Sequence, residues 1–590
     1  MKETNSNIRM LSALMLRLLP TQILLAAVGS VNGIVSSFFA SRYVGIAAMS
    51  AVGLYSPVGM LLQAVATMLM GGSVILCGKY MGQNRQEKLQ SVFSLDMVLS
   101  ALLAGGFSLL FALLAAFDLT GFFTRDTAVR PLFNRYVLGQ AIGIFPLLLG
   151  NQLSAFLSME NRQRRTMAAS LIYIAVNLML NALFVQALRL EAFGLALASS
   201  LGMWVFLAVQ AGYFLSGRSH LRLRLRKLPW GDIRDIVRVG GPGALSNGYQ
   251  TSRGLIVNWL LEAYVGTVGI SAFAAANNLL AVFWSLPVGM LAVSRMMISV
   301  SIGEEDRQTL ADVMRVMLRR YIPLMYAVAA LLIAFAAPLT GIFYRDPAEP
   351  VFRMTLWGIR ILPLCMPLSI LYMHYVCYCQ ASGRRRMVRV LSLLDGTADV
   401  AVFTALLIPV LGVNSVYIAN VLNGVVTTLV ILGWSAWKNK RFPRNMEDVL
   451  VFPADFGAAE DRRLDLTVRS VEQVVSIARQ VQSFCLERGI DPRRAYLSGL
   501  ALEEMAGNIV EHGFTKDRKS HSVDVRVVCK GDEVILRLKD DCAPFDPGER
   551  QRLADGDDVT RNIGLRMVFK TARDVQYQNI LGLNVLSIRL

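Results

Sequence analysis

The chain has 590 residues, of which 54% are hydrophobic and 17% are charged, and it carries a formal net charge of +17. Soluble domains have about a quarter of charged residues, so this composition excludes an ordinary soluble protein and indicates a membrane protein. The basic excess lies before residue 451, where 38 basic residues stand against 20 acidic ones, while the later residues have 21 and 22. These basic residues form short clusters between apolar runs, as membrane loops do. We therefore expect membrane lipid around the chain and no nucleic acid as a partner.

Twelve segments before residue 440 contain the roughly 20 mostly apolar residues that a membrane-spanning helix needs. They run over 18–40, 46–76, 90–117, 132–158, 167–188, 192–216, 240–261, 267–300, 313–338, 355–381, 389–410 and 413–436. Lys and Arg cluster between alternate spans, as at 162–165, 218–227 and 384–389. The positive-inside rule places these loops in the cytoplasm, and an even number of spans places both termini there as well. We expect a multi-pass protein of the cell membrane.

The spans repeat as two sets of six. The string "YVGIAAMSA" at 43–51 returns as "YVGTVGISA" at 264–272, and "LTGFFTRD" at 119–126 returns as "LTGIFYRD" at 339–346. Because six spans separate the copies, both have the same orientation, and an axis along the membrane normal would relate them around a shared cavity. The pattern predicts a membrane all-α domain over 1–445, with repeats at about 15–220 and 236–437.

These repeats resemble a known transporter family. The loops "GQNRQ" at 82 and "GEEDRQ" at 303, together with "NLMLNALFVQALRLEAFGLALASS" at 177–200, are similar to the multidrug and toxic compound extrusion (MATE) transporters of the MOP flippase superfamily. The resemblance covers about residues 15–437. It implies export of bulky, often cationic compounds by alternating access, driven by inward flow of Na⁺ or H⁺. The aspartate that ion-coupled members carry in the first helix is absent here, where the chain has "VGSVNGIV".

Polar residues within the spans mark the expected transport cavity, because an ionisable group at membrane depth costs roughly 3 kcal/mol. Asp395 and Asp399 lie one turn apart in the eleventh span, and Arg253 lies midway along the seventh. We expect Arg253 to pair with an aspartate and Asp399 to exchange a proton or coordinate Na⁺. A buried ion pair that only fixes helix register is the alternative. With their counterparts in the other repeat, the predicted cavity residues are Asn32, Asn177, Asn181, Arg253, Asp395 and Asp399.

After residue 445 shorter periodic segments predict a soluble α/β domain over 446–590. Strands are expected at "LDLTV", "SVDVRVVC", "EVILRLKDD" and "NVLSIRL", and helices at about 470–487, at 491–513 and in "IGLRMVFKTA". The second of these helices contains "ALEEMAGNIVEHGF", in which Glu504 and Asn508 share a face. A carboxylate four residues before a carboxamide suits phosphoryl transfer, since one group can hold a hydroxyl and the other Mg²⁺. A solvated helix face is the plainer interpretation.

The neighbouring motifs resemble the ATP-binding fold of histidine kinases, gyrase and heat-shock chaperones (the GHKL or Bergerat fold, an α/β sandwich). The helix is followed by the turn "DDCAPFDP" and by the glycine of "NIGLRMVFK", in the order found in that fold. Residues 460–590 are most similar to its compact branch, the anti-sigma-factor serine kinases. The resemblance implies ATP and Mg²⁺ as cofactors and a small cytoplasmic protein as a partner.

The same resemblance assigns roles to individual residues. Glu504 would be the general base and Asn508 the Mg²⁺ ligand, and Asp540 would hydrogen-bond the adenine amino group. The remaining ATP-binding residues would be Cys542, Gly564 beside the triphosphate, and Leu565. The segment 548–562 would form a lid. Cys542 and Asn562 stand where the motifs have glycine, and cysteine adopts a positive φ less readily than asparagine. We therefore expect ATP binding to be retained and ATP turnover to be the activity that these two residues could impair.

Three functions remain open from the sequence. The first is an ion-coupled exporter of a small molecule whose cytoplasmic tail binds ATP and Mg²⁺. The second is a membrane-tethered serine kinase or partner-switching protein whose spans act as a receptor. The third is a flippase for lipid-linked precursors, because the same superfamily includes such proteins.

Overall fold

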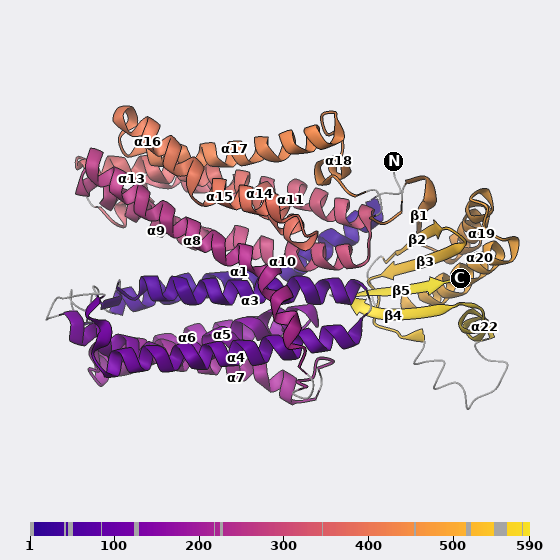
Figure 1. Ribbon diagram of the computed structural model, residues 1–590, viewed down its shortest axis with the longest axis horizontal. Coiled ribbons are helices and arrows are strands. Elements are labelled where there is room, and N and C mark those ends of the chain that lie inside the picture. Colours follow the sequence, from indigo (N-terminus) through magenta and orange to yellow (C-terminus); the bar gives the residue numbers. More distant parts are fainter. Residues whose placement is uncertain are drawn as a thin grey trace.

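The protein forms a bundle of long helices with a mixed α/β domain at one end (Figure 1). The structure is a computed structural model that describes residues 5–39, 43–44, 51–52, 54–83, 85–122, 129–217, 219–224, 228–344, 346–453, 456–458, 460–514, 521–547, 563–580 and 582–590.

The long helices fall into two sets along the chain. The first set is α1 (Asn5–Phe39), α3 (Ser56–Gly82), α4 (Gln86–Ala116), α5 (Val129–Met159), α6 (Gln163–Asn181) and α7 (Glu191–Leu215). The second set is α8 (Ile233–Tyr264), α9 (Thr267–Phe283), α10 (Ser285–Gly303), α11 (Arg307–Ala334), α12 (Ala336–Gly341), α13 (Pro350–Ile361), α14 (Cys365–Ala381), α15 (Arg385–Leu393), α16 (Asp399–Leu411) and α17 (Asn414–Asn439). Short helical turns lie at Leu119–Phe122, Trp230–Asp232, Leu362–Leu364 and Glu460–Arg462, and π turns at Ala182–Ala187, Leu394–Ala398 and Ile509–Gly513.

Eleven helical segments in the described part have the length and apolar composition of a membrane span, against the twelve predicted. The difference is α8, which matches the predicted span 240–261 but begins with Arg234, Asp235 and Arg238 and carries Arg253 midway. The polar run "SNGYQTSR" at 246–253 lowers the apolar content of this span, while the 32 residues of α8 are enough to run the length of the bundle. Figure 1 shows the start of α1 and the C-terminal domain at the same end. Twelve passes therefore stay a prediction, in which α8 is the twelfth.

Close backbone approaches join the two sets of helices at the end that carries the C-terminal domain. A side-chain carbon on Gly303 of α10 would overlap the carbonyl oxygen of Lys79 in α3, and one on Gly82 would overlap that of Val300. Only glycine permits such contact. A little further along, a side-chain carbon on Gly240 of α8 would overlap α3 in the same way. The two halves are therefore closely packed at this end.

The C-terminal domain is built on one antiparallel sheet in the order β1-β2-β3-β5-β4. Its strands are β1 (Arg463–Val468), β2 (Val523–Lys530), β3 (Glu533–Asp540), β4 (Asp574–Ile580) and β5 (Leu583–Arg589). Its helices are α19 (Val471–Glu487), α20 (Pro492–Asn508) and α22 (Ile563–Thr571), and the short α18 (Met446–Leu450) packs beside α17. The predicted α/β domain is confirmed. The domain boundary at residue 445 stays a prediction.

The two faces of the sheet differ in character because successive side chains of a strand point to opposite sides. Val525 and Val527 of β2 and Leu536 and Leu538 of β3 pack against the helices in one apolar core. The other face carries charged residues from β1, β2 and β3. This face would normally meet water. Here it lies against the helical bundle, and Val585 of β5 joins the apolar core of the bundle.

Candidate functional sites

Helix α20 presents the two residues predicted to serve phosphoryl transfer. Asp491 caps the helix by accepting hydrogen bonds from the amides of Arg493 and Arg494, which confirms the predicted start. At the other end, the Asn508 amide nitrogen donates to the Glu504 carboxylate at 3.2 Å. Both side chains are half-buried. The carboxylate oxygens of Glu504 and the carboxamide oxygen of Asn508 are hard ligands of the kind that Mg²⁺ prefers.

The start of α22 lies directly against this pair. A side-chain carbon on Gly564 would overlap the Glu504 carboxylate, so glycine is the residue that fits there. The backbone at the start of α22 is thereby held next to Glu504, where free helix amides favour phosphate. Leu565 is 4% exposed and packs in the apolar core. Its side chain anchors α22, which leaves only its backbone to face a nucleotide.

Asp540 ends β3 in a buried polar cluster. Its Oδ1 accepts hydrogen bonds from the Cys542 amide at 2.9 Å and from the Asn584 amide nitrogen at 2.8 Å. Burial raises the pKa of the Asp540 carboxyl, although Asn584 and the Cys542 amide lower it. Asn584 lies directly opposite Asp540 in the β3–β5 register. The sequence missed it because that register cannot be read from the chain.

Cys542 does not strain the turn in which it replaces glycine. It is not among the residues with positive φ, so the turn needs no glycine there. The Cys542 sulfur lies within 4.8 Å of a ring nitrogen of His521 and of a carboxylate oxygen of Asp541. A thiol, an imidazole and a carboxylate together bind Zn²⁺ more readily than Mg²⁺. His521 Nδ1 is 2.8 Å from the Asp541 carboxylate. The predicted lid 548–562 and Asn562 lie outside the described residues.

In the second half of the bundle, Arg253, Asp395 and Asp399 come together around a π turn. Arg253 donates to the main-chain carbonyl of Asp395 at 3.4 Å, rather than to its carboxylate as the predicted pair required. The carboxylate of Asp395 accepts instead from Asn423 of α17 at 2.9 Å. Oδ2 of Asp399 is buried with no hydrogen-bond partner among the described residues. The sequence missed Asn423, whose partner lies on another helix.

The corresponding residues of the first half form a separate cluster. The Asn181 side chain donates to the main-chain carbonyl of Asn177 at 2.9 Å, and the Asn177 side chain donates to Ser199 of α7 at 3.3 Å. In the described part of the chain, no hydrogen bond or ion pair joins this cluster to Asp395 or Asp399. Asn32 lies in α1, but its side chain is outside the described part.

Both clusters border a π turn, Ala182–Ala187 after Asn181 and Leu394–Ala398 before Asp399. Such turns are rare and occur often at functional sites. A further residue that the sequence missed is Asp96 of α4. It is fully buried and accepts from Ser73 at 2.6 Å through one carboxylate oxygen, and the other has no partner among the described residues. A lone acid in the apolar run "VFSLDMVLS" was the signal for it.

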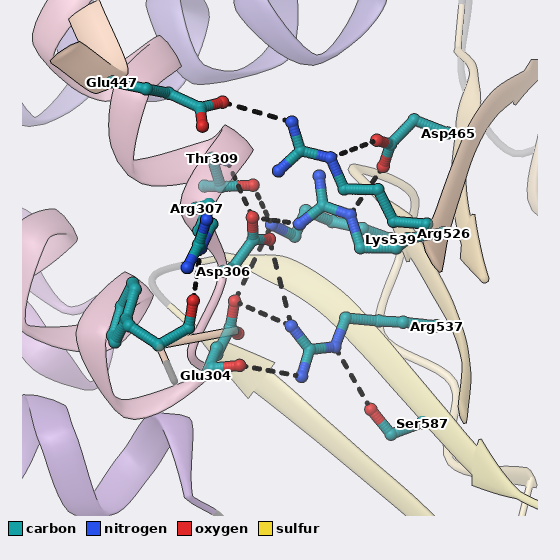
Figure 2. A network of polar contacts seen from close by, with 12 residues as sticks. Glu304, Asp306, Arg307, Thr309, Glu447, Asp465, Arg526, Arg537, Lys539 and Ser587 are labelled. Atoms are coloured by element: carbon teal, nitrogen blue, oxygen red, sulfur yellow. Dashed lines mark hydrogen bonds and ion pairs between the residues drawn. The ribbon is translucent and has the colours of Figure 1, made fainter. Parts of the chain in front are cut away.

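The charged face of the sheet docks on the turn between α10 and α11 (Figure 2). Asp306 caps α11 by accepting from the Thr309 amide at 2.8 Å, and it forms an ion pair with Arg526 of β2. The two charged side chains are 2% and 9% exposed. Burial alone would raise the pKa of Asp306, but Arg526, Lys539 and Arg537 together hold it well below its usual range. We define the junction network as Glu304, Asp306, Glu447, Arg463, Asp465, Arg526, Arg537 and Lys539, in which Arg463 pairs with both Glu447 and Asp465 (Figure 2).

The junction network neutralises a repulsion built into the sheet. Arg526 and Arg537 lie directly opposite each other on β2 and β3, where like charges destabilise strand pairing. Asp465 of β1 lies 2.5 Å from Arg526. The bundle supplies the remaining negative charge, since Glu304 lies 3.4 Å from Arg537 and Asp306 lies between both arginines. The charges of this sheet face are therefore balanced only when the domain is docked on the bundle.

The domain also contacts the first half of the bundle. A side-chain carbon on Gly582, in the β4–β5 turn, would lie 2.6 Å from the amide nitrogen of Asn161, in the α5–α6 turn. Lys539 and Asp540 are adjacent in β3 and point to opposite faces of the sheet. One strand thus carries both a junction residue and a residue of the predicted nucleotide site.

Comparison with protein families matches both parts of the chain. The MatE family matches residues 21–183 and 242–396, more than half of the chain. The histidine kinase-like ATPase domain matches residues 468–590. Two relatives are each described as "Probable multidrug resistance protein NorM". The one from Bacillus subtilis is 23% identical over 49% of this chain and 65% of its own length. The one from Bacillus licheniformis is 24% identical over 39% and 51%. The chain thus spans less than two thirds of either relative.

Solved structures match the helical bundle. An outward-facing multidrug resistance MATE family transporter of the MOP superfamily has a TM-score of 0.67 at 22% identity, over 72% of this chain and 95% of that chain. A MOP superfamily transporter from Pyrococcus furiosus, described as having a binding pocket of reverse polarity, has a TM-score of 0.66 at 21% identity, over 72% of this chain and 97% of that chain. Identities this low establish the fold alone. By the family matches, the chain belongs to the MatE family and carries a C-terminal histidine kinase-like ATPase domain.

Proposed function

We propose that the chain is an exporter of bulky organic compounds, often cationic, whose C-terminal domain lies in the cytoplasm and controls transport by binding Mg²⁺-ATP. Membership of the MatE family supports the transport activity. The proposed control of transport rests on the junction network, in which Asp306 of the bundle is buried against Arg526 of the ATPase domain. A buried charge cannot leave such a contact without a large cost. The position of the domain and the conformation of the bundle are therefore linked.

The residues of the predicted nucleotide site fit Mg²⁺-ATP. Asn508 would hold the metal, and the buried carboxylate of Asp540 would orient the adenine amino group. Gly564 leaves room for the backbone of α22 beside the phosphates. The bound nucleotide supplies a transferable phosphoryl group. Glu504, which accepts a hydrogen bond from Asn508, would take the proton of an attacking hydroxyl.

Inward flow of H⁺ or Na⁺ would drive the transport step through Asp395 and Asp399. The unpartnered buried oxygen of Asp399 supports this role, because a buried carboxylate oxygen needs a proton, a cation or a donor. Arg253 and Asn423 hold the main chain and the carboxylate of Asp395 in place. Asn32, Asn177 and Asn181 would complete the cavity from the first half.

Dye accumulation in cells tests the export proposal. Cells that express the chain should hold several-fold less of a cationic dye such as ethidium than cells with an empty vector, and Asp399→Asn should abolish the difference. Glu191→Gln removes a carboxylate from an exposed ion pair with Arg135 and serves as the control. Equal accumulation in expressing and empty cells, across a panel of dyes and drugs, would contradict export.

A second candidate activity is phosphoryl transfer to a serine of a small cytoplasmic protein. The Glu504–Asn508 pair favours it, since the same arrangement serves a protein hydroxyl and a water molecule. Incubation of the full chain with γ-labelled ATP and a cytosolic extract should label a small protein, and Glu504→Gln should remove that label. Release of labelled inorganic phosphate alone would identify an ATPase instead.

A further inference from the structure

A cavity lies where the C-terminal domain meets the first half of the bundle. It has a volume of about 920 Å³. The α5–α6 turn and the start of α6 line one wall, and the turn after Asp540 together with β4 lines the other. None of Glu504, Asn508, Asp540 and Gly564 lines it. The cavity is therefore distinct from the predicted ATP site, and its size is that of a small-molecule pocket.

The bundle wall of the cavity is rich in arginine. Arg17, Arg162, Arg164 and Arg165 line it, and no ion pair joins any of them to a carboxylate in the part of the chain that the structure describes. The guanidinium groups of Arg162 and Arg165 lie 5.7 and 5.0 Å from the ring centre of Tyr213. Tyr213 thus fixes both side chains. Four guanidinium groups around one space favour a phosphate ester.

The two carboxylates that line the cavity, Glu160 and Asp546, are outnumbered by the four arginines. Glu160 directs one oxygen away from them, to the Ser219 hydroxyl at 2.8 Å and the Leu221 amide at 3.0 Å. Asp546 belongs to the opposite wall. The net charge of the arginine wall is positive.

Three residues that line the cavity each have a buried carboxamide oxygen without a donor. They are Asn161, Gln163 and Gln578, and none of the three oxygens has a hydrogen-bond partner among the described residues. Gln163 is only 4% exposed. A buried acceptor is normally paired. Inorganic phosphate offers few donors, whereas the amino groups of a base and the hydroxyls of a sugar supply several.

The wall formed by the C-terminal domain supplies a surface for a planar group. Phe545 is 43% exposed and lines the cavity beside Tyr577. Its amide donates to the Tyr577 hydroxyl at 3.0 Å, which holds the two residues together. An exposed aromatic ring in such a cavity is suited to stacking on a nucleobase.

We propose that this cavity binds a nucleoside phosphate, with its phosphates on the arginine wall and its base against Phe545. The turn that carries Phe545 begins two residues after Asp540. A ligand in the cavity therefore acts on the segment that forms the predicted adenine site, and it joins the ATPase domain to the first half of the bundle. The site requires the docked domain but does not depend on any transport activity.

Equilibrium dialysis with labelled ATP and GTP tests the proposal on the full chain in phosphatidylcholine nanodiscs. Wild type should bind two nucleotides per chain. Asp540→Asn should lose one of them. The double variant Arg162→Gln, Arg164→Gln should bind the other at least about tenfold more weakly, because two charge-assisted contacts are lost. Arg135→Gln, which changes an exposed arginine outside the cavity, should keep both.

Several outcomes would overturn the proposal. One is a single nucleotide per wild-type chain that Asp540→Asn removes, and another is a second nucleotide that the double variant binds normally. Displacement of the second nucleotide by equimolar inorganic phosphate would identify a general anion site. Its loss in nanodiscs with phosphatidylglycerol would identify a lipid headgroup as the occupant. If Asp540→Asn abolishes the binding of both nucleotides, the cavity is part of the ATP site.

Discussion

Asp306 has two structural roles, and a single substitution separates them. It caps α11 and carries the negative charge that Arg526 requires. Asn caps a helix as well as Asp does but has no charge. Asp306→Asn should therefore lower the free energy of unfolding by about 3 kcal/mol, since it leaves buried guanidinium groups unpaired. Thermal and denaturant unfolding of the detergent-solubilised chain measure this loss.

The matched control is Glu191→Gln, which breaks an exposed ion pair with Arg135. It should change the free energy of unfolding by less than about 0.5 kcal/mol. If Asp306→Asn is as mild as this control, the junction network does not hold the domain on the bundle.

Glu504 and its neighbour Glu503 provide a second matched pair. Glu504 is half-buried next to Asn508, whereas Glu503 is exposed on the same helix. Glu504→Gln should slow ATP turnover at least about 100-fold, because a general base contributes that much, and should leave ATP affinity within about threefold. Glu503→Gln should leave both unchanged. Equal turnover in the two variants would remove Glu504 from the proposed role of base.

Asp524, on the docked face of β2, should make stability depend on pH. Burial raises the pKa of Asp524 to about 6, against the lowering effect of Arg526 and Lys539. A raised carboxyl pKa means that the folded state holds the proton more tightly. Stability from this group is therefore full below pH 4, falls as the pH rises to about 6, and stays low above it.

Asp524→Asn removes this dependence. The variant should be more stable than wild type at pH 7.5, by about 2 kcal/mol, and equal to it near pH 4. Denaturant unfolding at the two pH values gives the comparison. A difference that is the same at both would show that Asp524 does not titrate in this range.

At the scale of elements, the contact between α3 and α10 depends on glycine. Gly303→Ala would push its methyl group into the backbone of α3 and should destabilise the protein by about 2 kcal/mol. Gly106→Ala in α4 is the control, because nothing lies within 4 Å of the added carbon. It should be neutral or stabilise the helix by about 0.5 kcal/mol. Unfolding curves that rank the two variants in the opposite order would contradict the close approach.

Hydrophobic length and periodicity predicted most elements correctly, since they reflect burial that each segment needs on its own. They predicted the helices, four of the five strands and the start of the second helix at residue 491. They also predicted the face shared by Glu504 and Asn508. The sequence could not supply Asn584 or Asn423, which depend on register and helix packing. Nor could it show that Asp306 meets Arg526, because 220 residues of chain and a domain boundary separate them. The alternating charges of β2 and β3 resembled an ordinary solvated sheet face.

At the scale of the molecule, the ATPase domain contacts both halves of a bundle that has the fold of MATE family transporters. The junction network attaches it to the second half, and Gly582 lies against Asn161 of the first. Strand β3 carries Lys539 toward the bundle and Asp540 toward the predicted nucleotide site. Anything that moves the halves relative to each other must strain or shift this domain. By linkage, a nucleotide that favours one position of the domain favours one state of the bundle.

Transport by proteoliposomes, with Mg²⁺-ATP added to the side that carries the C-terminal domain, tests this control most directly. The account predicts that Mg²⁺-ATP changes the rate of ion-driven dye transport several-fold in wild type and in Glu191→Gln. It predicts no effect of Mg²⁺-ATP in Asp540→Asn, which should not bind it, or in Asp306→Asn, which should not transmit it. Active wild-type transport at a rate that Mg²⁺-ATP leaves unchanged would contradict the account.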